Sequence, residues 1–117
     1  MSEMSHVLVV EDDPLVSEVI AAALEDQFRT TIVETAAEAL RVLQGGDVRL
    51  MLLDCTLPGG LDEDLIPAAD RAGASVVLMS GDRGRIDQIV DRPRPFVLKP
   101  FSLARLMETV EKAIGDG

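Results

Sequence analysis

The feature that most constrains the fold is a fivefold alternation of short apolar runs with helical patterns. The runs occupy residues 7–10, 30–33, 50–53, 75–79 and 96–98. They are short and dominated by Val, Leu and Ile, as in strands that are buried on both faces. Strands that alternate with helices form a parallel sheet covered by helices on both sides, and right-handed crossovers leave few topologies. We therefore predict an α/β fold, a doubly wound (βα)5 parallel sheet.

Apolar residues at spacings of three and four predict the first two helices. The first helix follows Pro14, which suits the first turn of a helix. Its apolar stripe consists of Leu15, Val16, Val19, Ile20, Ala23 and Leu24. The second helix occupies residues 36–43, and Gly45 and Gly46 end it.

The remaining helical patterns are less regular. Residues 62–72 predict a third helix that begins near Pro67 or kinks there, because proline lacks a backbone donor. Residues 81–94 hold only a short stripe and predict a short or irregular fourth helix. Residues 103–114 predict a last amphipathic helix with Ser102 as its N-cap.

Length and charge narrow the class of protein. We expect one domain over residues 1–117, with a core of about 6–114 and no output domain. The net charge of −10 disfavours binding to nucleic acid or to an anionic membrane. The single Cys excludes an internal disulfide and a Cys-based zinc site. No apolar run reaches the roughly 18 residues of a spanning helix, and the N-terminus lacks a secretory signal, so we expect a cytoplasmic protein.

Polar residues directly follow four of the predicted strands. They are Glu11, Asp12 and Asp13 after the first, Asp54 after the third, Ser80 and Gly81 after the fourth, and Lys99 and Pro100 after the fifth. Ligands bind beyond the carboxyl ends of such strands. Converging carboxylates repel each other and favour an oxygen-ligated cation, Mg²⁺ or possible Mn²⁺. A carboxylate beside such a cation, with a lysine and a hydroxyl nearby, can accept and hold a phosphoryl group.

The motifs VLVVEDDP, LLDCTLPGG, VVLMSGD and FVLKPF, in this order, resemble the receiver domain of two-component response regulators. The resemblance covers residues 7–114 and is to the single-domain type. It implies a flavodoxin-like sheet with strand order 2-1-3-4-5. It also implies a phosphoacceptor signalling switch that assists its own phosphorylation and dephosphorylation. The implied partner is a histidine kinase or a histidine phosphotransfer protein. Separately from the resemblance, we expect a monomer or weak homodimer.

The resemblance also implies the role of each site residue. Asp54 is the expected phosphoacceptor, and Lys99 is expected to pair with a phosphoryl oxygen. The expected metal ligands are Glu11, Asp12, Asp54 and the backbone carbonyl of Thr56. The expected switch residues are Ser80 and Phe96. The expected phosphate-binding loop residues are Cys55, through its amide, and Gly81. The Lys99–Pro100 peptide is expected to be cis.

The sequence departs from the family pattern at two places. Gly81 stands where many members have Ala, which predicts easy phosphotransfer and quick hydrolysis of the phosphorylated form. The stretch 81–96 is short and Arg-rich, so we expect an altered output face. Phe96 replaces the commoner Tyr and lacks its hydroxyl.

Two other functions remain open at this point. A receiver-like interaction module could act without phosphorylation. A Mg²⁺-dependent phosphatase of the haloacid-dehalogenase type would use Asp54 as nucleophile, although its second Asp is replaced by Thr56. We expect His6 to be structural or solvated and the Cys55 thiol to have no redox role.

Overall fold

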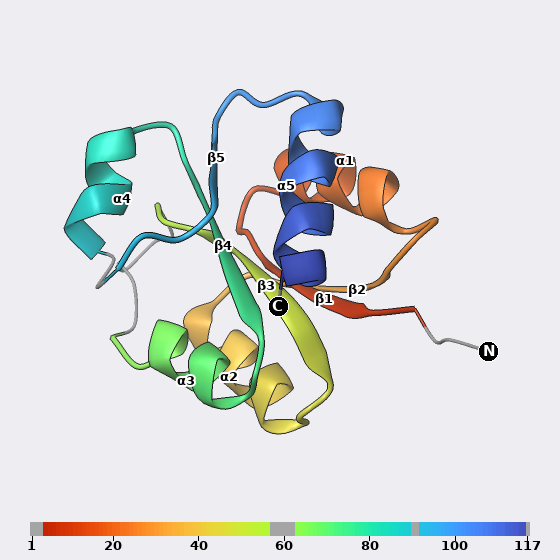
Figure 1. Ribbon diagram of the computed structural model, residues 1–117, viewed down its shortest axis with the longest axis vertical. Coiled ribbons are helices and arrows are strands. Elements are labelled where there is room, and N and C mark those ends of the chain that lie inside the picture. The colour runs from red at the N-terminus through yellow and green to blue at the C-terminus, as the bar shows by residue number, and fades with distance from the viewer. Residues whose placement is uncertain (1–3, 57–62, 90–91, 117) are drawn as a thin grey trace.

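Figure 1 shows the computed structural model, which describes residues 4–56, 63–89 and 92–116. Strands and helices alternate along the chain. The strands are β1 His6–Val10, β2 Arg29–Val33, β3 Val48–Asp54, β4 Ser75–Ser80 and β5 Phe96–Leu98. The helices are α1 Pro14–Leu24, α2 Ala36–Gln44, α3 Leu65–Arg71, α4 Arg83–Ile89 and α5 Leu103–Asp116. The predicted elements are confirmed. Residues 58–60 of the motif LLDCTLPGG and residues 90–91 of the stretch 81–94 lie outside the described residues.

The five strands form one parallel sheet in the order β2-β1-β3-β4-β5. This confirms the flavodoxin-like arrangement. Helices α2, α3 and α4 lie on one side of the sheet, and α1 and α5 lie on the other (Figure 1). Their buried side chains form two separate apolar clusters with the strands. Since every strand runs in the same direction, the carboxyl ends of β1, β3 and β4 meet at one edge of the sheet.

Alternation along the central strands divides the core in two. In β1, Leu8 and Val10 enter the cluster under α2 and α3, whereas Val7 and Val9 enter the cluster under α1 and α5. Successive strand residues point to opposite faces, so a strand buried on both faces needs an unbroken apolar run. The sequence pattern of these runs therefore follows directly from their central place.

Helix ends are fixed by polar side chains and by backbone geometry. Asp13 caps α1 by accepting from the amide of Leu15 at 2.9 Å. Ser102 caps α5 as predicted, accepting from the amide of Arg105 at 3.1 Å. Helix α3 begins near Pro67, at Leu65, so Pro67 lies within its first turn. A backbone amide there has no intrahelical acceptor, and a proline is tolerated.

The edge opposite the carboxyl ends is held by two polar clusters. The His6 ring contacts Asp47 Oδ1 at 3.1 Å and Thr31 Oγ1 at 2.7 Å, which confirms a structural role. Arg94 makes a bidentate ion pair with Asp70 of α3, with N···O distances of 3.0 and 2.8 Å. The Arg94 side chain is only 4% exposed, so this pair anchors the segment before β5 to α3.

The apolar stripe of α1 is only partly buried. Ile20 and Leu24 are fully buried, but Leu15 and Val19 are 73% and 48% exposed. These two residues lie at the side of the helix that the sheet and α5 leave uncovered. No helix in the described part of the chain is both long and apolar enough to cross a bilayer.

Candidate functional site

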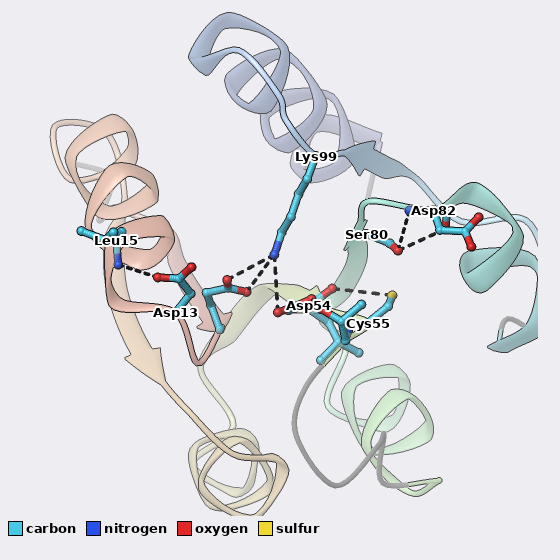
Figure 2. Close-up of polar contacts among 10 residues, drawn as sticks. Asp13, Leu15, Asp54, Cys55, Ser80, Asp82 and Lys99 are labelled. Carbon is cyan, nitrogen blue, oxygen red and sulfur yellow. Dashed lines mark hydrogen bonds and ion pairs between the residues drawn. The ribbon is translucent and has the colours of Figure 1, made fainter.

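Three carboxylates converge at the carboxyl edge of the sheet, as predicted. Glu11 and Asp12 follow β1, and Asp54 is the last residue of β3. One carboxylate oxygen from each lies within 4.8 Å of the others. Figure 2 shows Lys99 extending from the end of β5 toward this cluster. The sheet order explains the convergence, because β1 and β3 are neighbours.

Asp54 is a buried carboxylate with both oxygens oriented. Its Oδ1 accepts from the Thr56 amide at 2.9 Å and from Thr56 Oγ1 at 2.7 Å. Its Oδ2 lies 3.5 Å from Lys99 Nζ. Burial opposes ionisation, but hydrogen bonds from Glu11 and Thr56 and the charge of Lys99 outweigh it and lower the pKa of Asp54. The carboxylate is thus ionised and held in one orientation.

The pKa of Glu11 shifts in the opposite direction from that of Asp54. Burial, together with the hydrogen bond and negative charge of Asp54, raises its pKa to about 8, despite Lys99 Nζ at 3.2 and 3.4 Å. The single positive charge of Lys99 therefore does not neutralise the carboxylate cluster, and Glu11 retains a proton. A divalent cation would supply that charge in its place, and an all-oxygen donor set suits Mg²⁺. Glu11, Asp12 and Asp54 thus fit a metal; the role of the Thr56 carbonyl stays a prediction.

Ser80 ends β4 but is turned away from Asp54 (Figure 2). Its hydroxyl donates to the Asp82 carbonyl at 3.1 Å and accepts from the Asp82 amide at 3.0 Å. The Asp82 carboxylate in turn accepts from the amide of Gly84, in the first turn of α4, at 2.8 Å. Ser80 is thereby connected to the start of α4.

Phe96, the expected switch aromatic, is partly exposed on β5. The Arg83 guanidinium carbon lies 5.0 Å from the centre of its ring, a cation–π contact between α4 and β5. Sequence reasoning missed both Arg83 and Asp82 as neighbours of the switch residues. The only sequence signal for these contacts is that both residues lie in or next to the short Arg-rich segment after β4.

Cys55 requires a correction. Its amide donates to the Met79 carbonyl at 2.8 Å, so it belongs to the β3–β4 ladder and is not free to bind phosphate. Burial raises the pKa of its thiol to about 11, which leaves it a poor nucleophile and agrees with the absence of a redox role.

The space around Gly81 is open, since a Cβ there would meet nothing within 4 Å. The Lys99–Pro100 peptide is cis, as predicted.

Comparison with known sequences places this site in a family. The family model of the response regulator receiver domain matches residues 7–111. Swarming motility regulation protein RssB of Serratia marcescens is 33% identical over 112 residues, which are 91% of this chain and 51% of that protein. DNA-binding response regulator MtrA of Mycolicibacterium smegmatis is 29% identical over 111 residues, 90% of this chain and 48% of that protein. The chain spans about half the length of the curated relatives it matches.

Solved structures agree with the fold. A response regulator receiver protein from Sinorhizobium medicae superposes with a TM-score of 0.87 at 18% identity, covering 97% of this chain and 96% of that one. The receiver domain of sensor histidine kinase PA1611 from Pseudomonas aeruginosa has a TM-score of 0.80 at 25% identity, covering 97% and 99%. That structure has a magnesium ion coordinated in its active site cleft. Because the family model matches most of its length and its strands have the order β2-β1-β3-β4-β5, the chain belongs to the response regulator receiver domain family.

Proposed function

We propose that this chain is a phosphoacceptor switch, in which Asp54 takes a phosphoryl group from a phosphohistidine on a histidine kinase or a histidine phosphotransfer protein. The observation that carries the proposal is the Asp54 carboxylate. It is buried and ionised, one oxygen is held by Thr56, and the other faces Lys99. Thr56 occupies the position at which the phosphatase alternative requires a second Asp, and it serves here as a hydrogen-bond donor.

Transfer would exchange one bond to phosphorus for another. A carboxylate oxygen of Asp54 bonds to phosphorus as the bond from phosphorus to the imidazole nitrogen breaks, and the nitrogen keeps the electron pair. Lys99, 3.5 Å from Asp54, is placed to neutralise charge on the oxygens of the transferred group. Bound Mg²⁺ would add further positive charge at the same oxygens. Hydrolysis of the aspartyl phosphate would return the protein to its starting state.

The signal would pass through Ser80 and Phe96. The phosphoryl group offers the Ser80 hydroxyl a charged acceptor, which competes with the two hydrogen bonds to Asp82. Because the Asp82 carboxylate caps the start of α4, such a movement of Ser80 would also shift that helix end. Phe96, beside α4, would change its packing with it.

An apolar groove next to the site suits a macromolecular phosphodonor. Its volume is about 440 Å³, and it lies between α1 and the start of the β5–α5 segment. Exposed Leu15 and Val19 line one side, and Pro100 and Phe101 line the other. Lys99 lines the groove and also contacts the carboxylates, so a partner that covers this groove brings its own side chains to Asp54.

The test is the intact mass of the protein after incubation with acetyl phosphate, with and without Mg²⁺. We expect the mass to increase by one phosphoryl group only when Mg²⁺ is present. Asp54→Asn should abolish the increase, whereas the matched variant Asp87→Asn, which changes an exposed acid of α4, should retain it.

Phosphorylation of Asp54→Asn to the same extent as the wild type would contradict the proposal. If the folded wild type takes no phosphate from acetyl phosphate, a phosphorylated histidine phosphotransfer protein is the second donor to try. Failure with both donors would favour the interaction module that acts without phosphorylation.

A further inference from the structure

A cavity at the amino edge of the sheet takes no part in the proposed phosphotransfer. Its volume is about 540 Å³, and it lies at the start of β4, between the end of α3 and the segment 92–95 that precedes β5. The carboxylate cluster and Ser80 lie at the opposite, carboxyl ends of the strands. Sites for small molecules usually have volumes of about 300–1,000 Å³. The cavity is therefore large enough for a small organic ligand.

The charged side chains that line this cavity carry a net positive charge. Among the described residues they are Arg92, Arg94 and Asp70, so two guanidinium groups face one carboxylate. An ionised phosphate monoester carries nearly two negative charges at neutral pH, which is more than this lining balances. A single carboxylate balances it. The charge of the cavity therefore favours a monoanion over a dianion.

Arg94 is already engaged by Asp70. Its two terminal nitrogens donate to the two oxygens of Asp70 at 3.0 and 2.8 Å, and its side chain is only 4% exposed. The hydrogen bonds and the charge of Arg94 lower the pKa of Asp70, so the pair stays ionised at neutral pH. Arg94 and Asp70 thus form a fixed wall of the cavity.

Within the described part of the chain, Arg92 has no comparable acceptor. Its contact with Asp70 is long, at 3.4 Å, and goes to Oδ1, the oxygen that already accepts from Arg94 at 3.0 Å. The Arg92 side chain is 62% exposed. A guanidinium group presents several N–H donors in one plane, and a carboxylate can accept two of them side by side. Arg92 is therefore available to bind an external carboxylate in the cavity.

The remaining lining is mostly apolar. It includes two exposed prolines and three buried aliphatic residues, namely Pro93, Pro95, Ala74, Val76 and Ala113. Ser75 adds a hydroxyl, which donates to the Ala113 carbonyl at 3.3 Å and whose oxygen can still accept. Small-molecule sites typically combine such apolar walls with a few polar groups that fix the orientation of the ligand. A ligand with an apolar body would remove this surface from water.

We propose that this cavity binds a small organic monocarboxylate, with its carboxylate on Arg92 and its apolar body against the proline and aliphatic side chains. The proposal goes beyond phosphotransfer at Asp54 and does not require it. An inorganic anion fits less well, because it would leave the apolar lining uncovered. A ligand bound here would contact both the end of α3 and the segment before β5, which the Arg94–Asp70 pair already connects.

The experiment is a fluorescence titration of 2-naphthoate with the unphosphorylated protein in the absence of Mg²⁺. The chain has no Trp and no Tyr, so the naphthalene emission can be followed with little emission from the protein. Neutral 2-naphthamide and dianionic 2-naphthyl phosphate share the aromatic body and differ in charge. We expect saturable binding of 2-naphthoate, about tenfold or more weaker binding of the amide, and weaker binding of the phosphate. The titration needs no phosphodonor, so its outcome is separate from that of the phosphorylation test.

Two variants with the same change in charge test the role of Arg92. Arg92→Gln removes the expected carboxylate ligand and leaves the Arg94–Asp70 pair intact, whereas Arg41→Gln changes an exposed position of α2. We expect Arg92→Gln to weaken binding of 2-naphthoate about tenfold or more and Arg41→Gln to have little effect. Thermal unfolding followed by circular dichroism checks that both variants fold.

A heteronuclear NMR titration of the wild type locates the bound probe. We expect 2-naphthoate to shift the amide signals of Gly73, Ala74 and Ser75, which line the cavity, and to leave those of Glu11 and Asp54 in place. Shifts confined to the carboxyl edge of the sheet would overturn the proposal, since they would assign the anion to Lys99. So would equal affinity for the acid and the amide, or an equal effect of the two variants. Tighter binding of the phosphate would overturn the preference for a monoanion.

Discussion

Glu11 provides a test of the carboxylate cluster that needs no phosphodonor. In the folded, metal-free protein its pKa is raised to about 8, from 4.5 for an unperturbed glutamate, first by burial and then by Asp54. Between these values the folded state holds a proton that the unfolded state has released. The free energy of unfolding must then fall as the pH rises, with most of the effect present from about pH 5 to pH 8.

The magnitude follows from proton linkage. One proton bound only by the folded state changes the free energy of unfolding by about 1.4 kcal/mol per pH unit. From pH 5.5 to pH 7.5 the metal-free protein should lose about 2–3 kcal/mol. Mg²⁺ should remove this dependence and raise stability, because the cation replaces the proton on Glu11 and binds only the folded state.

The assay is urea unfolding in a chelator, followed by circular dichroism at several pH values. A urea m-value of about 1–3 kcal/mol/M predicts that the midpoint falls by about 0.7–3 M across this range. Glu11→Gln should flatten the curve, whereas the exposed control Glu18→Gln should keep the wild-type slope. Metal-free stability that stays constant, or a Glu11→Gln slope equal to that of the wild type, would refute the reasoning.

Three further predictions follow from the geometry. Gly81→Ala should fold normally, since its Cβ meets open space, and should lengthen the lifetime of phosphorylated protein several-fold, measured by loss of label; an unchanged lifetime would argue against Gly81 as the cause of quick hydrolysis. Asp70→Asn should lower the free energy of unfolding by about 1–2 kcal/mol at neutral pH, because Arg94 lowers the pKa of Asp70 and loses its charged partner, and the difference from wild type should vanish as the pH falls below the ordinary range of Asp; urea midpoints measure both. Leu15→Ser/Val19→Ser should slow phosphorylation by a phosphotransfer protein about tenfold or more but leave the acetyl phosphate rate unchanged, and equal slowing with both donors would contradict a docking role for the groove.

The central strands show why most of the fold could be predicted from sequence. Residues 7–10 and 50–53 are unbroken apolar runs because each side chain in them is buried on one face or the other. The exposure of Leu15 and Val19 could not be predicted in the same way. Spacing identifies the apolar side of a helix but not how much of it the neighbouring elements cover.

The residues that gather at the carboxyl ends of the strands could be predicted from the sequence. The individual hydrogen bonds that depend on strand register could not. Glu11 and Asp54 end neighbouring parallel strands, so their convergence follows from topology. The amide of Cys55 bonds to Met79 because the β3–β4 ladder continues one residue past Asp54. His6 reaches Asp47, 41 residues away, at the start of β1, where the pairing with β3 shifts register. No local pattern reveals either contact.

The hydrogen bonds between Ser80 and the Asp82 backbone determine what fraction of unphosphorylated molecules adopts the active arrangement. If the Ser80 hydroxyl marks the active state by turning toward Asp54, it must first leave a donor and an acceptor that already satisfy it. Two such bonds are worth about 2 kcal/mol together, which corresponds to about a 30-fold bias toward the resting arrangement. The turn of backbone after β4 then sets the fraction of active molecules in the absence of phosphorylation. Changes in the sequence of this turn can alter that fraction without altering the phosphoacceptor.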